Sequence, residues 1–188
     1  HESPEVRIAA IKSISGLVPN GQRSLLLGPL LDDRDQNVRL AAVNALLGLS
    51  PDDLGLYFGP LEQAIDAWEQ VLKSAPESAE NHYQLARLHL HNAEFKEAQQ
   101  ALENTLRLAP DNLPALVMQI DVLDKLGQSD AARQLLARQL KAQPDSAYLQ
   151  HALGLWLLNH GQSEFALLGL SKAVELEPDN KDYRYDLA

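Results

Sequence analysis

Proline, small and large apolar positions recur through the later part of the chain at a spacing of 34 residues. The prolines are Pro76, Pro110, Pro144 and Pro178. The same spacing links an alanine column (Ala64, Ala98, Ala132, Ala166), a large apolar column (Trp68, Leu102, Leu136, Leu170) and a small column (Gly59, Ala93, Gly127, Gly161). A period in this range is typical of a repeat array built from stacked supersecondary units.

Each unit is predicted to be a pair of helices. The proline ends one helix, because it has no N–H and the residue before it disfavours the α region. The Asp/Glu-Ser/Asn pair that follows caps the next helix, and a small residue such as Gly127 allows a sharp turn between the two. The alanine column is expected where two helices approach closely. The predicted helix pairs are 79–92 with 95–108, 113–126 with 129–142, and 147–160 with 163–176.

These positions resemble the tetratricopeptide repeat (TPR). The block 79–112 carries Leu85-Ala86, Phe95, Ala98, Leu102 and Pro110, and the block 147–180 carries Leu153-Gly154, Leu157, Gly161, Ala166, Leu170, Ala173 and Pro178. The middle block departs, because Gln119-Ile120 replaces the usual pair of leucine and a small residue. The resemblance implies a right-handed α-solenoid of stacked antiparallel helix pairs. It places a TPR array over 60–188: a helix at 60–75, full repeats at 79–112, 113–146 and 147–180, and the start of another helix at 181–188.

The first 59 residues follow a different pattern. Segments 4–17 (PEVRIAAIKSISGL) and 36–49 (QNVRLAAVNALLGL) align at an offset of 32, with an apolar helix candidate at 23–31 and an aspartate-rich turn at 32–35 between them. This resembles HEAT-like repeats, in which Arg7 and Arg39 would pair with turn aspartates and hold neighbouring units in register. Ser50-Pro51 predicts a cap and a helix start. Residues 1–59 are therefore interpreted as HEAT-like helical repeats and a joint.

Composition supports an all-α fold. The chain has 37 Leu and 24 Ala but only 14 Val, Ile and Thr together, and sheets favour the β-branched residues. A net charge of −10 argues against nucleic-acid binding. The longest apolar stretch, seven residues over 152–158, is too short to span a membrane. Because the chain starts at His1 and its single methionine is Met118, we interpret it as a fragment or a processed chain, in which His1 is a candidate tag remnant.

Motifs for catalysis or for cofactor binding are not found. The sequence has no phosphate-binding loop, HExxH, G-x-S-x-G or dinucleotide turn, and no cysteine. His89 and His91 are two residues apart on a predicted helix and point in different directions, so the histidines are interpreted as surface or groove residues. Asp121 and Asp124 share a helical face without a partner base. Trp68 and Trp156 are predicted to be core residues. No catalytic residue, metal site or cofactor is expected.

A binding surface is expected instead. In TPR-like stacks the first helix of each pair lines a concave groove, and stacked helices of this kind present a groove for a peptide or a helix of a partner protein. The acidic charge favours a neutral or basic partner with apolar anchors. The resemblance places the following residues in the groove: Tyr83, Gln84, Arg87, His91, Val117, Met118, Asp121, Asp124, Lys125, Tyr148, His151, Leu155, Asn159 and Tyr185.

The leading hypothesis is a non-catalytic protein-interaction module. The domain order also resembles the C-terminal part of bacterial multihaem c-type cytochrome-like TPR proteins, which would make the chain an accessory or docking domain of an exported, periplasmic protein. Otherwise a cytoplasmic location is expected. A third alternative is a structural scaffold that self-associates through its C-terminal face. An enzymatic role, as in the HEAT-like bilin lyases, is the least favoured, because no nucleophile or cofactor site was found.

Overall fold

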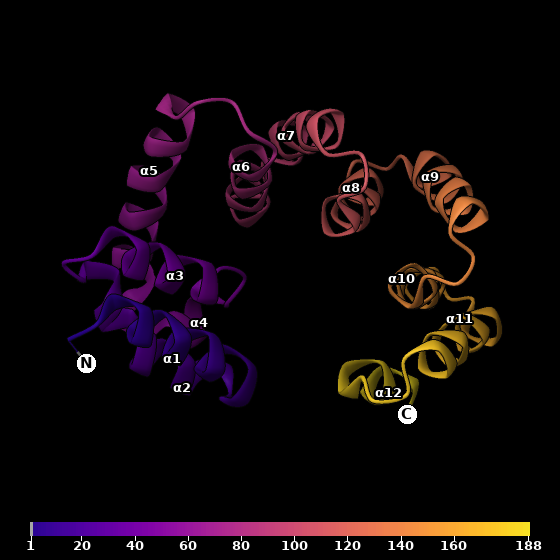
Figure 1. Ribbon diagram of the computed structural model, residues 1–188, viewed down its shortest axis with the longest axis horizontal. Helices are drawn as coiled ribbons and strands as arrows, with labels where there is room; N and C mark the ends of the chain where they lie inside the picture. Colours follow the sequence, from indigo (N-terminus) through magenta and orange to yellow (C-terminus); the bar gives the residue numbers. More distant parts are fainter. Residues whose placement is uncertain (1) are drawn as a thin grey trace. The chain divides into compact units, whose positions relative to one another are not determined.

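The computed structural model describes residues 2–188, so His1 and its interpretation lie outside the described residues. The described chain folds into helices joined by short turns, with no strand between residues 2 and 188, which confirms the all-α fold (Figure 1). The chain divides between Glu94 and Phe95 into two compact units. We call them the N-terminal unit (residues 2–94) and the C-terminal unit (residues 95–188).

The N-terminal unit mixes long helices with short ones. Its elements are α1 (Pro4–Leu17), α2 (Asn20–Leu27), the 3₁₀ helix η1 (Gly28–Asp32), α3 (Gln36–Leu46), α4 (Pro51–Leu54), the 3₁₀ helix η2 (Gly55–Tyr57), α5 (Phe58–Ser74) and α6 (Ala79–His91). The helix expected over 23–31 thus begins earlier, at Asn20, and tightens to 3₁₀ geometry at Gly28. A Cβ at Gly28 would lie 2.3 Å from the Tyr57 ring, so this change of geometry coincides with a close approach that only glycine permits.

The turn before α3 contains an ion pair that was expected from the sequence, between Arg7 and a turn aspartate. Arg7 Nη2 lies 2.8 Å from Asp33 Oδ1. Arg39 differs, because its Nη1 donates to the backbone carbonyl of Asp33 at 2.7 Å rather than to a carboxylate. Hydrogen bonding from the Asp35 backbone N–H, and then from Arg7, lowers the pKa of the Asp33 carboxyl below its ordinary value. Asp33 therefore stays charged and links α1 to the start of α3.

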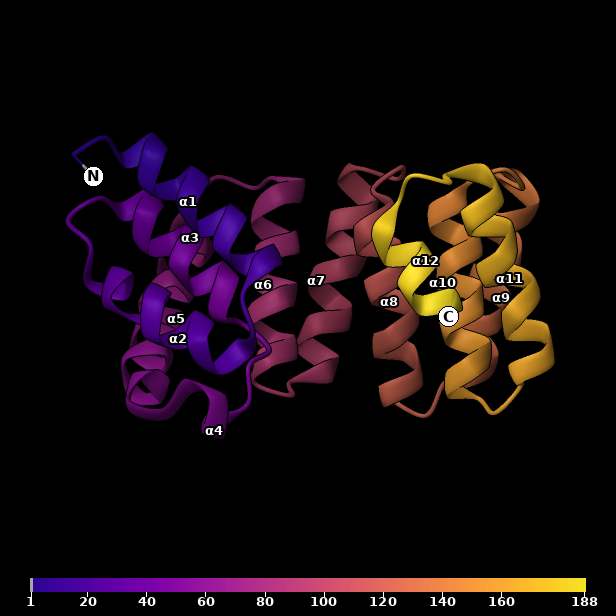
Figure 2. The ribbon, with the colours of Figure 1, turned by 90° about the horizontal axis from the view of Figure 1, so that it is seen from below.

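The C-terminal unit is regular. Its helices are α7 (Phe95–Leu108), α8 (Leu113–Lys125), α9 (Ser129–Ala142), α10 (Ala147–Asn159), α11 (Ser163–Leu176) and α12 (Lys181–Leu187), within two residues of the predicted bounds. Figure 2 shows α8, α9, α10 and α11 running roughly up and down in neighbouring positions. The predicted caps are present along the repeats of both units, because Ser78, Asn112, Ser146 and Asn180 each accept a hydrogen bond from a backbone N–H of the next helix.

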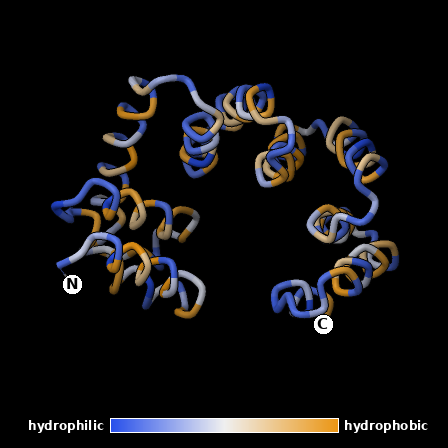
Figure 3. The backbone as a smooth tube through the Cα atoms, viewed as in Figure 1, coloured by the Kyte–Doolittle hydropathy of each residue, from blue (hydrophilic) through white to orange (hydrophobic). Residues whose placement is uncertain are grey.

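The predicted columns are buried in the later repeats. Ala98, Ala132, Ala166, Leu102, Leu136 and Leu170 are at most 2% exposed. The small column forms turns at Ala93, Gly127 and Gly161, which have φ values of 57°, 73° and 71°. Gly59 is an exception, because it lies inside α5 and makes no turn. In the tube of Figure 3, hydrophobic and hydrophilic stretches alternate around most helices, as expected for helices with one buried face.

Candidate functional site

Helix α6 carries the first group of predicted groove residues, and two of them bind neighbouring helices. Arg87 donates from Nη2 to the Asn44 carbonyl of α3 at 3.2 Å, and from Nη1 to the side chain of Asn44. His91 accepts at Nδ1 from the Gly48 N–H (3.4 Å), which leaves its Nε2–H to donate to Glu62 of α5 at 3.1 Å. Tyr83 is half-buried, and this burial raises the pKa of its phenol. Arg87 and His91 therefore connect α6 to α3 and α5.

Gln84, the fourth predicted residue of α6, lines a cleft of about 480 Å³ between α1, α3 and α6. We call it the α1–α3–α6 cleft. Its polar lining consists of the amides Asn37, Asn44 and Gln84 together with Lys12, Ser15 and Glu80, and its apolar lining consists of Ile11, Leu40, Ala41 and Ala45. Primary amides both donate and accept hydrogen bonds, so this lining can pair with the N–H and C=O groups of a peptide backbone.

Helix α8 holds the second group, in the C-terminal unit. Asp121 is exposed and lies 3.4 Å from Lys125 one turn later. Asp124 is mostly buried and lies 3.5 Å from His160, which follows α10. Val117 packs partly against the core, and Met118 is half-buried. A cavity of about 610 Å³ in this unit lies between α7, α8 and α9 and contains none of the predicted residues.

Helices α10 and α12 hold the third group. His151 donates from Nε2 to Asp186 Oδ2 at 2.7 Å, and the centroid of its ring lies 4.6 Å from that of Tyr183. Tyr148 is 37% exposed and Tyr185 is 83% exposed. Leu155 is half-buried and Asn159 is exposed. The structure thus places these residues on adjacent helices of the C-terminal unit and leaves the two tyrosines accessible.

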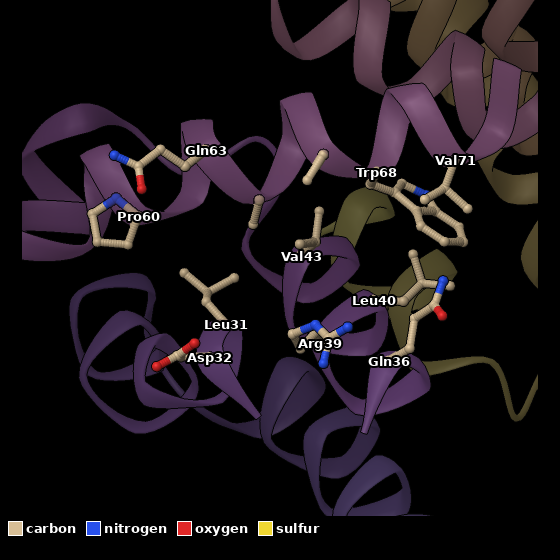
Figure 4. Close-up of a pocket in the computed structure, with 12 residues that line it drawn as sticks. Leu31, Asp32, Gln36, Arg39, Leu40, Val43, Pro60, Gln63, Trp68 and Val71 are labelled. Carbon is tan, nitrogen blue, oxygen red and sulfur yellow. The ribbon is translucent and has the colours of Figure 1, made fainter. Parts of the chain in front are cut away.

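A second cleft of the N-terminal unit was not anticipated from the sequence. It has a volume of about 530 Å³ and lies between α5 on one side and η1 and α3 on the other (Figure 4). We call it the α3–α5 cleft. Its lining residues are Leu31, Asp32, Gln36, Arg39, Leu40, Val43, Pro60, Gln63, Ala64, Ala67, Trp68 and Val71. Leu40 also lines the α1–α3–α6 cleft, so α3 separates the two.

The histidines are more closely paired than the sequence suggested. Each histidine within residues 2–188 has a carboxylate oxygen within 3.5 Å of a ring nitrogen: His82 with Glu77, His89 with Glu94, His91 with Glu62, His151 with Asp186 and His160 with Asp124. Three of these carboxylates are on other helices, 29 to 36 residues away along the chain, so no local pattern could reveal the pairs.

Neither a cluster of metal-ligating side chains nor a membrane-spanning helix occurs among the described residues. Among residues 2–188, no group of three His, Asp or Glu side chains is arranged to hold a metal ion. Over the same residues, no helix has the length and hydrophobicity needed to cross a bilayer.

Comparison with known proteins identifies the family. The family model for the tetratricopeptide repeat matches residues 56–115 and 94–155, which together span more than half of the chain. The chain therefore belongs to the tetratricopeptide repeat family. It is also 41% identical over 76 residues to the uncharacterized protein y4yS of Sinorhizobium fredii (strain NBRC 101917 / NGR234). This match covers 40% of the chain and 42% of the relative, so the chain spans less than half of that protein.

Solved structures show the same fold over most of the chain. TTC0263, a thermophilic TPR protein of Thermus thermophilus, aligns with a TM-score of 0.67 and 19% identity, over 98% of this chain and 97% of that one. YrrB, described as a TPR protein with an unusual peptide-binding site, aligns with a TM-score of 0.52 and 21% identity, over 98% of each chain. At these identities the likeness concerns the fold alone.

Proposed function

We propose that this protein is a non-catalytic interaction module that binds an extended peptide segment of a partner protein through the face of α6 in the N-terminal unit or through the faces of α8 and α10 in the C-terminal unit. The observation that carries the proposal is the α1–α3–α6 cleft. Its lining combines three amide side chains, among them the sequence-predicted Gln84, with apolar residues. The described peptide-binding site of YrrB, a protein of similar fold, also supports a peptide ligand.

The lining of the α1–α3–α6 cleft supports a peptide ligand with an apolar anchor. The apolar floor at Ile11 and Leu40 accommodates an apolar anchor, while Asn37 and Gln84 pair with backbone groups of the peptide. In the lining the positive charge of Lys12 offsets the negative charge of Glu80, but the chain as a whole has a net charge of −10. Long-range attraction therefore favours a neutral or basic peptide and speeds its association.

The accessible tyrosines of the C-terminal unit form a second part of the proposal. Tyr148 and Tyr185 supply amphipathic rings on neighbouring helices, and tyrosine is enriched among the interface residues that dominate binding energy.

The division of the chain at residue 59 into a HEAT-like part and a TPR array belongs to the same proposal, and the ion pair between Arg7 and Asp33 supports it.

The test begins with peptides selected from a displayed random-peptide library against the full chain. Gln84→Ala is expected to weaken a selected peptide about tenfold if the peptide binds the N-terminal unit, and Tyr148→Ala to do so if it binds the C-terminal unit. Gln100→Ala, an exposed position of α7, is the matched control and is expected to change the Kd less than about twofold. Unchanged binding in both test variants would contradict the groove assignment.

A further inference from the structure

Helix α5 differs from the equivalent helices α7, α9 and α11. In those helices the alanine and large apolar columns are at most 2% exposed. In α5 the same columns hold Ala64 and Trp68, which are only half-buried and line the open α3–α5 cleft. The buried Nε1 atom of Trp68 also has no hydrogen-bond acceptor among residues 2–188. The element that covers these columns in the other repeats is therefore missing at α5.

In the C-terminal unit that element is the preceding antiparallel helix. Ala132 and Leu136 of α9 share a buried cluster with three apolar residues of α8, namely Leu116, Ile120 and Leu123. Two repeat periods earlier, the positions equivalent to those three are Gly48, Asp52 and Gly55. None of them carries an apolar side chain, and this stretch folds as a turn, the short helix α4 and the start of η2. The chain thus supplies no apolar helix at the position that would cover α5.

The α3–α5 cleft is long enough to hold about three turns of a helix. Its wall on α5 is one helical face in which Pro60, Ala64, Ala67 and Val71 follow each other at intervals of three or four residues. That face extends over about 17 Å, or roughly three helical turns. Its opposite wall includes Leu31 and Leu40. A groove of this kind receives apolar side chains at positions i, i+3 or i+4, and i+7 of a partner helix.

The charges around the α3–α5 cleft favour basic residues on either side of the apolar stripe of the partner helix. Asp32 lines the cleft and is exposed. Asp66 is also exposed, and because it follows the lining residue Gln63 by three positions on α5, it lies at the edge of the lining face. Arg39 is the one basic residue of the lining, and it already donates to the Asp33 carbonyl. The two carboxylates outnumber the guanidinium, so basic side chains beside the apolar stripe complement the rim.

We propose that the α3–α5 cleft is a docking site, separate from the α1–α3–α6 cleft, for an amphipathic helix of a partner protein with basic residues flanking its apolar stripe. The incoming helix takes the place that the first helix of the pair occupies in the other repeats. Its apolar side chains cover Ala64, Trp68 and Val71, and its basic side chains meet Asp32 and Asp66.

The probe is a fluorescently labelled synthetic helix about four turns long, with leucines along one face and lysines beside them. Its binding to the full chain is measured by fluorescence anisotropy at about 0.15 M salt, where long-range attraction is screened. A peptide of the same composition in scrambled order, which has no apolar stripe, is expected to bind about tenfold more weakly. In a Trp156→Phe background, binding is also expected to shift the emission of Trp68, the remaining tryptophan.

Variants of exposed residues assign the site. Ala67→Arg and Val71→Lys place a cation in the cleft and are each expected to weaken binding about tenfold or more, because they block the groove and repel the basic helix. Gln100→Arg adds the same charge on α7, and Gln84→Ala alters the other cleft. Both are expected to change the Kd by less than about twofold. Circular dichroism checks that each variant is folded.

Three results would overturn the proposal. Equal binding of the scrambled peptide would show that charge alone attracts the probe. A loss of binding in Gln84→Ala, with none in Ala67→Arg, would place the helix in the α1–α3–α6 cleft. A concentration-dependent dimer of the unliganded chain that Ala67→Arg dissociates would show that a second copy covers the α3–α5 cleft. None of these three results depends on the peptides selected from the library. If Gln84→Ala leaves the binding of those peptides unchanged, the helix-docking proposal can still hold, so the two proposals can fail separately.

Discussion

In the C-terminal unit, α10 and α11 meet through two glycines, whereas in the N-terminal unit arginine side chains tie α3 to its neighbours. A Cβ at Gly169 would lie 2.9 Å from the Gln150 carbonyl and 3.0 Å from the Gly154 nitrogen. Around α3 the contacts are polar: Arg7 and Arg39 bind Asp33, and Arg87 binds Asn44. Regular repeats can stack through small residues at fixed positions, while helices of unequal length need specific side-chain pairs to fix their arrangement.

The largest expected effect is on the glycine contact. Gly169→Val forces atoms against the backbone of α10, which cannot move aside, so we expect the free energy of unfolding to fall by about 3 kcal/mol. The measurement is chemical denaturation followed by circular dichroism. Gly59→Val is the control, because nothing lies within 4 Å of a Cβ there, and it is expected to change stability by less than about 0.5 kcal/mol. Equal effects of both substitutions would show that the contact is not tight.

The next effect tests the polar clasps of the N-terminal unit. Arg87→Met keeps most of the side-chain packing but removes the bonds to Asn44, so a loss of about 1.5 kcal/mol is expected. Arg133→Met removes an arginine that is 65% exposed and paired with Asp130, and is expected to cost less than about 0.5 kcal/mol. Chemical denaturation measures both variants. If Arg87→Met is as mild as Arg133→Met, polar clasps do not distinguish the N-terminal unit.

A smaller effect concerns the turns of the small column, where Ala93 and Gly127 share positive φ values. Ala93→Gly is expected to stabilise the protein by about 0.5 kcal/mol, and Gly127→Ala to destabilise it by about 1 kcal/mol, since only glycine adopts this region without strain. Thermal unfolding of both variants provides the measurement. Changes of the same sign would be inconsistent with equivalent turns.

The smallest expected effect is the pH dependence of the Asp33 clasp. The folded-state pKa of Asp33 is lowered, so its contribution to stability is present above the ordinary aspartate pKa of about 4 and is lost as the pH falls below it. Asp33→Asn should therefore be less stable than the wild type at pH 7, and the difference should shrink toward a pH of about 3. Urea unfolding at both pH values measures it. A difference that grows on acidification would contradict the lowered pKa.

The sequence predicted the repeats well and the earlier helices less well. Prolines, caps and turn residues act on the local backbone, so the helices from Ala79 onward lie within two residues of their expected bounds. The extent of α2 was not predicted, because its transition into η1 coincides with the close approach of Gly28 to Tyr57, a residue of a later element. The helical position of Gly59 was missed for a related reason, since α5 follows a different preceding segment from the other helices of its column.

The candidate sites were also predicted only in part. The resemblance to the tetratricopeptide repeat was enough to nominate Gln84 and Tyr148, because it implies which positions of each repeat line the groove. It could not show that Arg87 binds Asn44, which is 43 residues away, or that His91 binds Glu62, which is 29 residues away. The α3–α5 cleft was also missed, because it arises from the helix that is lacking before α5.

By itself, the sequence determined the class of fold, the period of the array, the helix ends and the small and large columns that become buried. These features depend on backbone propensity and on periodic spacing, which act within one or two helices. Only the tertiary structure decided which polar groups pair across helices, where Gly154 and Gly169 touch, and that α3 separates two clefts. Those outcomes depend on how particular side chains fill the space between helices, and that space exists only after the helices have packed.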